Sequence, residues 1–359
     1  MKIALALLGT LVLVSIFLVV RYFTRLGKPV NEGLSHSYYY DRKGEKVIYS
    51  PMGNWFELGY HETDADPTSF VVLSTYAGKD SKTVYWKGKK TQADPGSFII
   101  DSNRIPKDKF HVYFPCDYPD SLYVIEGADP ATYQSLPILN ERYWHHWDVD
   151  ATSIFLDGKK VEAERATFVR LSSSIATDIS YVYSIEASDS IAAGSPGATI
   201  LVRRGKKPDG EATVINENYA RIGHSIVHSG WQNRFSQLPF DKINSIRVLD
   251  ERNILVDGIL ISDGKRIEGI DEVSLEIIGR DFFKDKNSVY CLTEKIHGAN
   301  PKTFLYVWEE YAKDDQHVFY KTQVLEGVKP NTFTIDYPSG IASDGNLSFK
   351  DGQLVTTKK

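Results

Sequence analysis

Residues 76–85 read Tyr-Ala-Gly-Lys-Asp-Ser-Lys-Thr-Val-Tyr, and residues 311–319 read Tyr-Ala-Lys-Asp-Asp-Gln-His-Val-Phe. In both stretches an Asp is followed four residues later by Val and then by an aromatic residue. The same rule, with Ile allowed in place of Val, holds at further positions: Asp108 with Val112, Asp150 with Ile154, Asp178 with Val182, and Asp285 with Val289. Self-similarity of this kind indicates an internal repeat.

A second motif, Ala-Asp-Pro-x-Ser/Thr-aromatic, alternates with the first. It spans residues 65–70, 93–98 and 128–133, and it returns in weaker form before Phe304 and Phe333. Ten residues separate its aromatic from the next motif Asp in four pairs: Phe70 and Asp80, Phe98 and Asp108, Phe168 and Asp178, Phe304 and Asp314. Tyr133 and Asp150 are 17 apart, which indicates a seven-residue insertion. The interval from each Asp to the following aromatic varies, as a hairpin loop of adjustable length would produce.

The repeated residues have a structural interpretation. An Asp in a tight turn accepts backbone N–H bonds two residues on, and a Val-aromatic pair suits entry into a strand. Lys87-Gly88, Asp157-Gly158, Asp257-Gly258 and Asp351-Gly352 are typical of hairpin turns. The aromatic of the second motif is expected to be the apolar plug of each repeat. The positions predicted to build the repeats are Asp80, Val84, Phe98, Asp108, Val112, Asp150, Phe168, Asp178, Asp285, Val289, Phe304, Asp314, Val318 and Phe333.

Asp285-Lys286-Asn287-Ser288-Val289-Tyr290 closely resembles the consensus of the DKNYY family of bacterial repeat proteins. The resemblance extends from about Tyr38 to Phe333 and depends on repetition more than on any one copy. It implies an exported or envelope-associated protein, and it brings no activity, cofactor or catalytic residue with it.

We therefore expect an all-β body over residues 38–359, made of tandem antiparallel hairpin repeats of about 28 residues. Aromatic residues make up 12% of the chain, which favours β structure. An open curved or solenoid-like array is the first choice, and a closed propeller-like ring is the alternative. Residues 26–37 are expected to be a short linker, and residues 185–240 a degenerate or inserted segment.

Residues 3–20 carry no charge and, as a helix, would span about 27 Å, close to the thickness of a bilayer core. Arg21 to Arg25 follow as an aromatic and basic collar. We expect residues 1–25 to be an uncleaved single-pass anchor, with a cleavable signal peptide as the alternative. The body is expected to be extracytoplasmic, periplasmic or at the cell surface, although the flanking charges by themselves favour a cytoplasmic body.

Candidate chemical sites are few. His145 and His146 lie beside Asp148 and Asp150, and His224 and His228 are four residues apart. Ser172, Ser173 and Ser174 have no recognisable base partner, and Glu309 and Glu310 would point to opposite faces of a strand. A calcium ladder built from the motif Asp residues is disfavoured, because no Asp-x-Asp-x-Asp-Gly run occurs. We expect no cofactor, no metal and no enzyme activity.

The expected function is that of a non-enzymatic interaction or scaffold module of the cell envelope, with a protein partner of unknown identity. Binding of an envelope ligand, for example a glycan, through exposed aromatics is the alternative, and an enzyme with an unrecognised site is the third choice. A net charge of −5 gives no footprint for nucleic acid. Cys116 and Cys291 lie in repeats far apart in the sequence, so we expect no disulfide between them.

Overall fold

The computed structural model describes residues 12–18, 26–51, 60–117, 120–137, 145–187, 196–230, 234–279 and 281–355. Residues 12–18 form a short helix, and everything else with regular secondary structure in these ranges is β-strand. Nine sheets of four strands and two sheets of two strands make up this described part. The chain is therefore all-β with antiparallel pairing, as the repeats predict.

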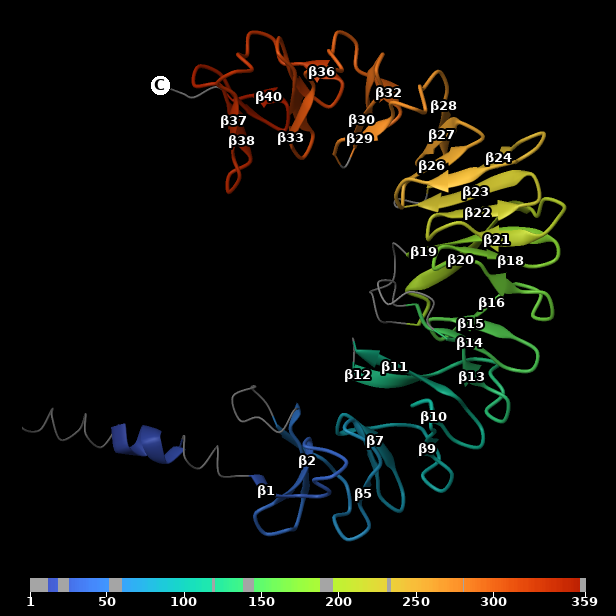
Figure 1. The fold of residues 1–359 in the computed structure, drawn as a ribbon. Helices are drawn as coiled ribbons and strands as arrows, with labels where there is room; N and C mark the ends of the chain where they lie inside the picture. The colour runs from blue at the N-terminus through green and yellow to red at the C-terminus, as the bar shows by residue number, and fades with distance from the viewer. Residues whose placement is uncertain are drawn as a thin grey trace, which may run out of the picture. The chain divides into compact units, whose positions relative to one another are not determined.

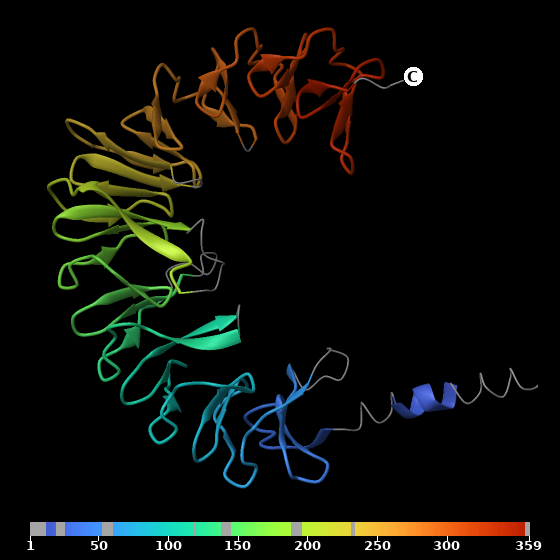
Figure 2. The ribbon, with the colours of Figure 1, turned by 180° about the vertical axis from the view of Figure 1, so that it is seen from behind.

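The strands follow one another along the chain in Figure 1, and Figure 2 shows the same succession from behind. Residues 26–124 form β1 (Leu26–Pro29), β2 (Tyr38–Asp41), β3 (Val47–Tyr49), β4 (His61–Glu62), β5 (Val71–Val72), β6 (Ala77–Lys79), β7 (Val84–Trp86), β8 (Lys89–Lys90), β9 (Ile99–Ile100), β10 (Pro106–Lys107), β11 (Tyr113–Asp117) and β12 (Asp120–Val124). Residues 134–239 form β13 (Gln134–Ser135), β14 (Trp147–Val149), β15 (Ile154–Leu156), β16 (Lys159–Val161), β17 (Val169–Arg170), β18 (Ile175–Thr177), β19 (Tyr181–Ala187), β20 (Thr199–Lys206), β21 (Ala212–Val214), β22 (Tyr219–Ile222), β23 (Ser225–Gly230) and β24 (Arg234–Pro239).

The remaining strands are shorter and more regular. They are β25 (Ile246–Val248), β26 (Asn253–Val256), β27 (Ile259–Ser262), β28 (Lys265–Ile267), β29 (Glu276–Ile277), β30 (Phe282–Lys284), β31 (Val289–Cys291), β32 (Glu294–Lys295), β33 (Leu305–Trp308), β34 (Tyr311–Lys313), β35 (Val318–Tyr320), β36 (Gln323–Val324), β37 (Thr334–Asp336), β38 (Ile341–Ser343), β39 (Ser348–Lys350) and β40 (Gln353–Leu354). The chain divides into two compact bodies, residues 1–169 with 185–203, and residues 170–184 with 204–359.

One repeat is a meander of four strands, that is, two successive hairpins rather than one. In the sheet β5-β6-β7-β8 the registers pair Val72 with Gly78, Lys79 with Val84 and Trp86 with Lys89. Four strands fit into about 20 residues because each strand is only two or three residues long. The motif Asp lies in the turn between the second and third strands, and the predicted Lys-Gly turn joins the third and fourth.

The predicted hairpin turns are confirmed by their backbone angles. Lys87 and Gly88 both have positive φ, 48° and 75°, as a two-residue type I′ turn requires. The Asp-Gly pairs at 157–158, 257–258 and 351–352 share this conformation. At Gly88 a side chain would be obstructed as well as strained, because a Cβ atom would lie 2.6 Å from the Cβ of Tyr49 in the preceding repeat.

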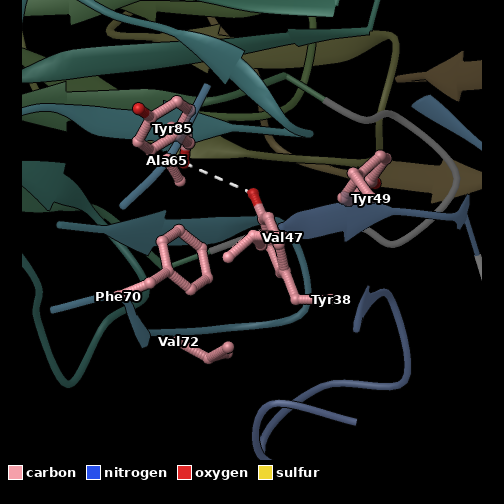
Figure 3. Packing of buried hydrophobic residues seen from close by; sticks show 7 residues of the cluster. All are labelled: Tyr38, Val47, Tyr49, Ala65, Phe70, Val72 and Tyr85. Carbon is pink, nitrogen blue, oxygen red and sulfur yellow. Dashed lines mark hydrogen bonds between the residues drawn. The ribbon is translucent and has the colours of Figure 1, made fainter. Parts of the chain in front are cut away.

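Apolar side chains fill the space between consecutive sheets. Figure 3 shows the first such cluster, in which Tyr38, Val47 and Tyr49 of one sheet meet Phe70 and Tyr85 of the next. The same layering recurs in the second body, where Phe304 lies in one cluster with Phe282, Val289 and Phe319. Each aromatic plug is thus shared between two neighbouring repeats, as expected for a repeat that cannot bury its apolar face alone.

Three segments differ from the regular repeat. Residues 26–37, which the sequence assigns to a linker, include β1, and β1 pairs with β2 as the first strand of the first sheet. The predicted degenerate segment 185–240 contributes strands β19 to β24, the longest of which is the eight-residue β20. Asp250 keeps the spacing to Ile254 but is followed by Leu255 in the aromatic position, and it lies in the turn between the first and second strands of its sheet instead of the second and third.

The predicted membrane anchor lies mostly outside the described residues. Only the short helix at residues 12–18 is described within it, and no described helix is both long and apolar enough to cross a membrane.

Candidate functional site

The motif Asp residues are buried and act as acceptors for their own turn. The carboxylate oxygen Oδ1 of Asp80 accepts the backbone N–H groups of Lys82 at 2.8 Å and Thr83 at 2.7 Å. The same pair of bonds, from the second and third residues after the Asp, is made by Asp108, Asp150, Asp178, Asp285, Asp314 and Asp344. All of these side chains are at most 8% exposed.

The second oxygen of the motif Asp reaches back to the preceding repeat. Oδ2 of Asp80 accepts the backbone N–H of Asp66 at 3.0 Å, and Oδ2 of Asp108 accepts that of Asp94 at 2.9 Å. Asp271 to Asp285 and Asn300 to Asp314 repeat this bond at the same separation of 14 residues. Asp129 and Asp150 make it across 21 residues, so the predicted seven-residue insertion leaves the bond intact.

A hydroxyl group of the second motif completes this connection. Ser97 donates to the carboxylate of Asp94 at 2.6 Å and accepts the backbone N–H of Lys109, one residue past the motif Asp, at 3.1 Å. Ser69, Thr132 and Ser274 make the equivalent pair of bonds. We call the motif Asp and the hydrogen-bonded residues of the preceding second motif the clasp.

The fixed spacing of ten residues in the sequence is therefore the spacing of the clasp. With this spacing, the aromatic plug packs between two sheets. The hydroxyl residue directly before the plug hydrogen-bonds to the turn of the next motif Asp.

Tyrosine adds a further donor at three motif Asp residues. The hydroxyl of Tyr113 donates to Oδ2 of Asp108 at 2.6 Å, and Tyr85 and Tyr183 donate equivalently to Asp80 and Asp178. Burial by itself would raise the pKa of the Asp108 carboxyl, but the bonds from Tyr113 and three backbone N–H groups outweigh burial and leave the pKa lowered. Burial and the adjacent carboxylate raise the pKa of Tyr113.

A lysine connects the motif Asp turn to the second motif that follows it. This contact was not predicted from the sequence. Lys79, immediately before the motif Asp80, donates from Nζ to the carbonyl oxygens of Pro95 at 2.8 Å and Phe98 at 3.1 Å in the next second motif. Lys313 reaches Pro330 at 2.9 Å in the same way. The Lys-Asp pair therefore binds the preceding and the following second motif at once. The recurrence of Lys before Asp was the signal in the sequence.

A tyrosine at the start of the second strand forms another connection between repeats. The hydroxyl of Tyr38 donates to the carbonyl oxygen of Tyr76 at 2.9 Å and accepts the N–H of Gly88 at 3.1 Å. Tyr219 with Gly264, and Tyr311 with Gly352, repeat the bond to glycine at 2.9 Å.

The predicted apolar positions are placed as follows. Val84, Val112, Val289 and Val318 are fully buried, and the plugs Phe98, Phe304 and Phe333 are 0%, 1% and 3% exposed. Phe168 is only half-buried and packs against Trp147, with 5.4 Å between ring centroids.

The histidine pair at 145 and 146 does not form a common site. Nδ1 of His145 lies 3.1 Å from Oγ1 of Thr199 and 4.0 Å from Oδ2 of Asp157, whereas the ring of His146 packs edge-on against Phe114. A nucleophile–base–acid arrangement needs its hydroxyl and carboxylate on opposite ring nitrogens, and here both lie at the same one. Burial lowers the pKa of His145.

The other candidates also serve the fold. His228 is 1% exposed and packs against Tyr219, while His224 lies exposed in the turn before β23. Ser172 and Ser174 each donate to the backbone carbonyl of Glu217 at 2.8 Å.

Glu309 lies in a turn with positive φ, and Glu310 pairs with Lys321 at 3.1 Å. Within the described ranges no group of three or more His, Cys, Asp or Glu side chains is placed to hold a metal ion.

Comparison with protein families finds one match. The sequence profile of the DKNYY family matches residues 116–353, which is more than half of the chain. A search of curated proteins finds no match. The clasps at Asp80 and Asp108 precede the matched range, yet their hydrogen bonds agree with those of Asp285 inside it.

Proposed function

The chain belongs to the DKNYY family, and from this premise we propose that it is a non-enzymatic repeat protein of the cell envelope that acts as an interaction or scaffold module. The observation that carries the proposal is the clasp. The carboxylate, hydroxyl and ammonium groups that recur in the sequence form hydrogen bonds between neighbouring repeats. The recurring polar residues therefore have a structural role. What varies from repeat to repeat is the exposed surface, which is where recognition by repeat proteins resides.

The first strand of each repeat offers such a surface. The residue directly after the plug is apolar and about half exposed in several repeats: Val71 at 48%, Ile99 at 50%, Val169 at 51% and Leu305 at 60%. Each belongs to a strand at the end of its sheet, where one edge has no partner strand within its sheet. Exposed aliphatic side chains beside an unpaired edge support binding of another polypeptide.

A photo-crosslinking amino acid placed at Ile99 tests the scaffold function in intact cells. We expect a specific protein adduct that is lost when the neighbouring Val71 is replaced by Lys. The matched control is a crosslinker at Val273, which is 97% exposed but lies in a turn. Equal labelling at Val273 and Ile99, or no adduct at Ile99, would remove the support for this surface.

The N-terminal apolar segment is proposed to tether the body on the extracytoplasmic side of the membrane. The uncharged run at residues 3–20 and the aromatic and basic collar after it support the tether, and membership of a family of exported or envelope-associated proteins supports the side, against the flanking charges. Protease added to intact spheroplasts should digest the body, and deletion of residues 1–25 should release it from the membrane. Full protection from the protease would reverse the orientation.

Binding of an envelope ligand is the second candidate function. One groove in the first body favours it, because the aromatic side chains of Trp86, Tyr113 and Tyr123 line a cavity there.

A further inference from the structure

The groove lies between two hairpins of the first body, β7–β8 and β11–β12, of which β7, β11 and β12 are labelled in Figure 1. Its volume is about 400 Å³, within the range of small-ligand sites. Trp86 and Lys89 come from the first hairpin, Gln92 follows it, and Tyr113 and Tyr123 come from the second.

An irregularity of the repeat creates this groove. The strands β11 and β12 are five residues long and pair in a sheet of their own, from Tyr113 with Val124 to Asp117 with Asp120. The preceding strands β9 and β10 form a separate two-stranded sheet. Elsewhere in the described ranges four strands share one sheet, whereas here only the bridge between Lys107 and Val112 joins the second and third strands, and the third and fourth strands, β11 and β12, are lengthened. Insertions in repeat proteins commonly form binding faces.

The wall of the groove contains an unused hydrogen-bond donor. Trp86 is only 7% exposed, and its indole N–H has no acceptor among the residues that the structure describes. The nitrogen is itself buried, so a ligand in the groove cannot reach it unless the wall rearranges. The polar contacts of a ligand therefore fall to exposed side chains of the groove such as Lys89, whose ammonium is a donor only and favours a ligand that is rich in acceptor oxygens.

The charge of the groove selects among such ligands. Lys89 and Lys90 both line it. The ammonium of Lys90 lies 2.9 Å from a carboxylate oxygen of Asp64, whereas Lys89 has no ion pair with any described residue. Lys89 is thus available to a carboxylate on the ligand.

Tyr123 is 38% exposed, and its ring offers the flat apolar surface on which a sugar ring stacks. Together the ring of Tyr123, the ammonium of Lys89 and the amide of Gln92 match a sugar that carries an acid group. We propose that this groove binds a carboxylate-bearing sugar, an inference that rests on the second candidate function.

Two probes that differ by one carboxylate test the proposal on the full-length protein in detergent. N-acetylmuramic acid carries a lactyl carboxylate that N-acetylglucosamine lacks, and titration calorimetry with tryptophan fluorescence follows both. We expect the acidic sugar to bind roughly tenfold more tightly, since a charge-assisted bond contributes about that factor. Lys89→Ala should remove this preference, and Tyr123→Ala should weaken both sugars. Lys302→Ala, an exposed lysine in the other body, is the matched control.

Gln92→Ala separates recognition from folding. Because Gln92 is exposed and lies outside the neighbouring core cluster, the variant should unfold at the same denaturant concentration as the parent while binding both sugars several-fold more weakly, about the effect of one hydrogen bond. Equal affinity for the two sugars would overturn the acidic preference and leave ligand binding standing. Binding of neither sugar would overturn both. Equal binding of N-acetylglutamate would assign the groove to peptide carboxylates and overturn the proposal for sugars.

Discussion

The hydroxyl of Tyr113 donates a 2.6 Å hydrogen bond to the carboxylate of Asp108, five residues earlier in the chain, and both groups are buried. The same carboxylate holds three backbone N–H groups, one of which belongs to Asp94 in the preceding second motif. One side chain therefore determines the shape of its own turn and the position of the neighbouring repeat.

Replacement of Asp108 by Ala is expected to be severe. It leaves the Tyr113 hydroxyl and the buried N–H groups without their acceptor, and each bond to a charged group contributes about 1.5–3 kcal/mol. Tyr113→Phe removes one donor only and should cost about 1–2 kcal/mol. Urea unfolding measures both, with Tyr123→Phe on the exposed face of the next strand as the control. A smaller loss for Asp108→Ala than for Tyr113→Phe would refute the central role of the carboxylate.

Acid should weaken the clasps. The pKa values of Asp80, Asp108 and Asp150 are lowered, since backbone and hydroxyl donors outweigh the burial that would raise them, and donors lower that of Asp344 to about 2. A carboxyl with a lowered pKa stabilises the fold fully above its unfolded pKa, about 3.9, and loses that contribution as the pH falls through the folded value.

The unfolding free energy should therefore be constant near pH 6 and fall steadily from about pH 4 towards pH 2. Asp108→Asn should show a shallower decline because one titrating group is gone. A stability at pH 3 equal to that at pH 6 would mean that the carboxylates contribute little.

The plugs are expected to dominate the energy between repeats. Phe98→Ala and Phe304→Ala should each cost about 3–5 kcal/mol, the usual range for truncating a buried Phe. Phe110→Ala is the matched control, because Phe110 is 60% exposed in the same repeat as the Asp108 turn. Chemical denaturation compares the three, and similar small losses for all would show that Phe98 and Phe304 are not plugs.

Lys79 should stabilise the contact with the following repeat. Lys79→Met keeps most of the aliphatic stem and removes the ammonium that binds the carbonyls of Pro95 and Phe98, so we expect a loss of about 1–3 kcal/mol. Lys82→Met, three residues away on the exposed surface, should change stability little. Amide exchange around Pro95 provides a local readout, and unchanged protection of the Phe98 amide would count against the forward connection.

The two cysteines should be inert in the folded protein and unlinked. Both are buried and neither forms a disulfide, and burial raises the pKa of Cys291 to about 12, far above the pH of ordinary alkylation. Iodoacetamide at pH 8 should modify Cys291 only after denaturation, when both thiols react once. A crosslinked peptide containing Cys116 and Cys291 would contradict this prediction.

The sequence predicted the clasp only in part, for a physical reason. Asp108 and Phe98 act through their side chains. Their residue types must therefore recur at a fixed spacing, which makes them visible in the sequence. Their partners are largely backbone groups, such as the N–H of Asp94, and any residue except proline supplies such a group. The backbone N–H of Gly88 donates to the hydroxyl of Tyr38, which lies 50 positions earlier in the chain, so no local sequence pattern predicts this bond.

The division of a repeat into four strands was also hard to predict. With only two or three residues each, strands such as β5 and β8 are too short to show alternation of apolar and polar residues. The groove depends on the lengthened hairpin β11–β12, where the interval between motifs is longer than in the regular repeats, so the repeat pattern does not predict it.

The Lys-Asp pair hydrogen-bonds to the second motif before it and to the one after it. This has a consequence for how such chains change length during evolution. Asp80 binds the second motif before it and Lys79 binds the one after it, so repeats that carry the Lys-Asp pair present the same two ends. Duplication or loss of a whole period, cut anywhere, rejoins compatible ends and needs no compensating substitution. A cut that removes part of a period leaves a carboxylate or an ammonium buried without its partner. Gene rearrangements that preserve the period should therefore be tolerated, and family members should differ by whole repeats.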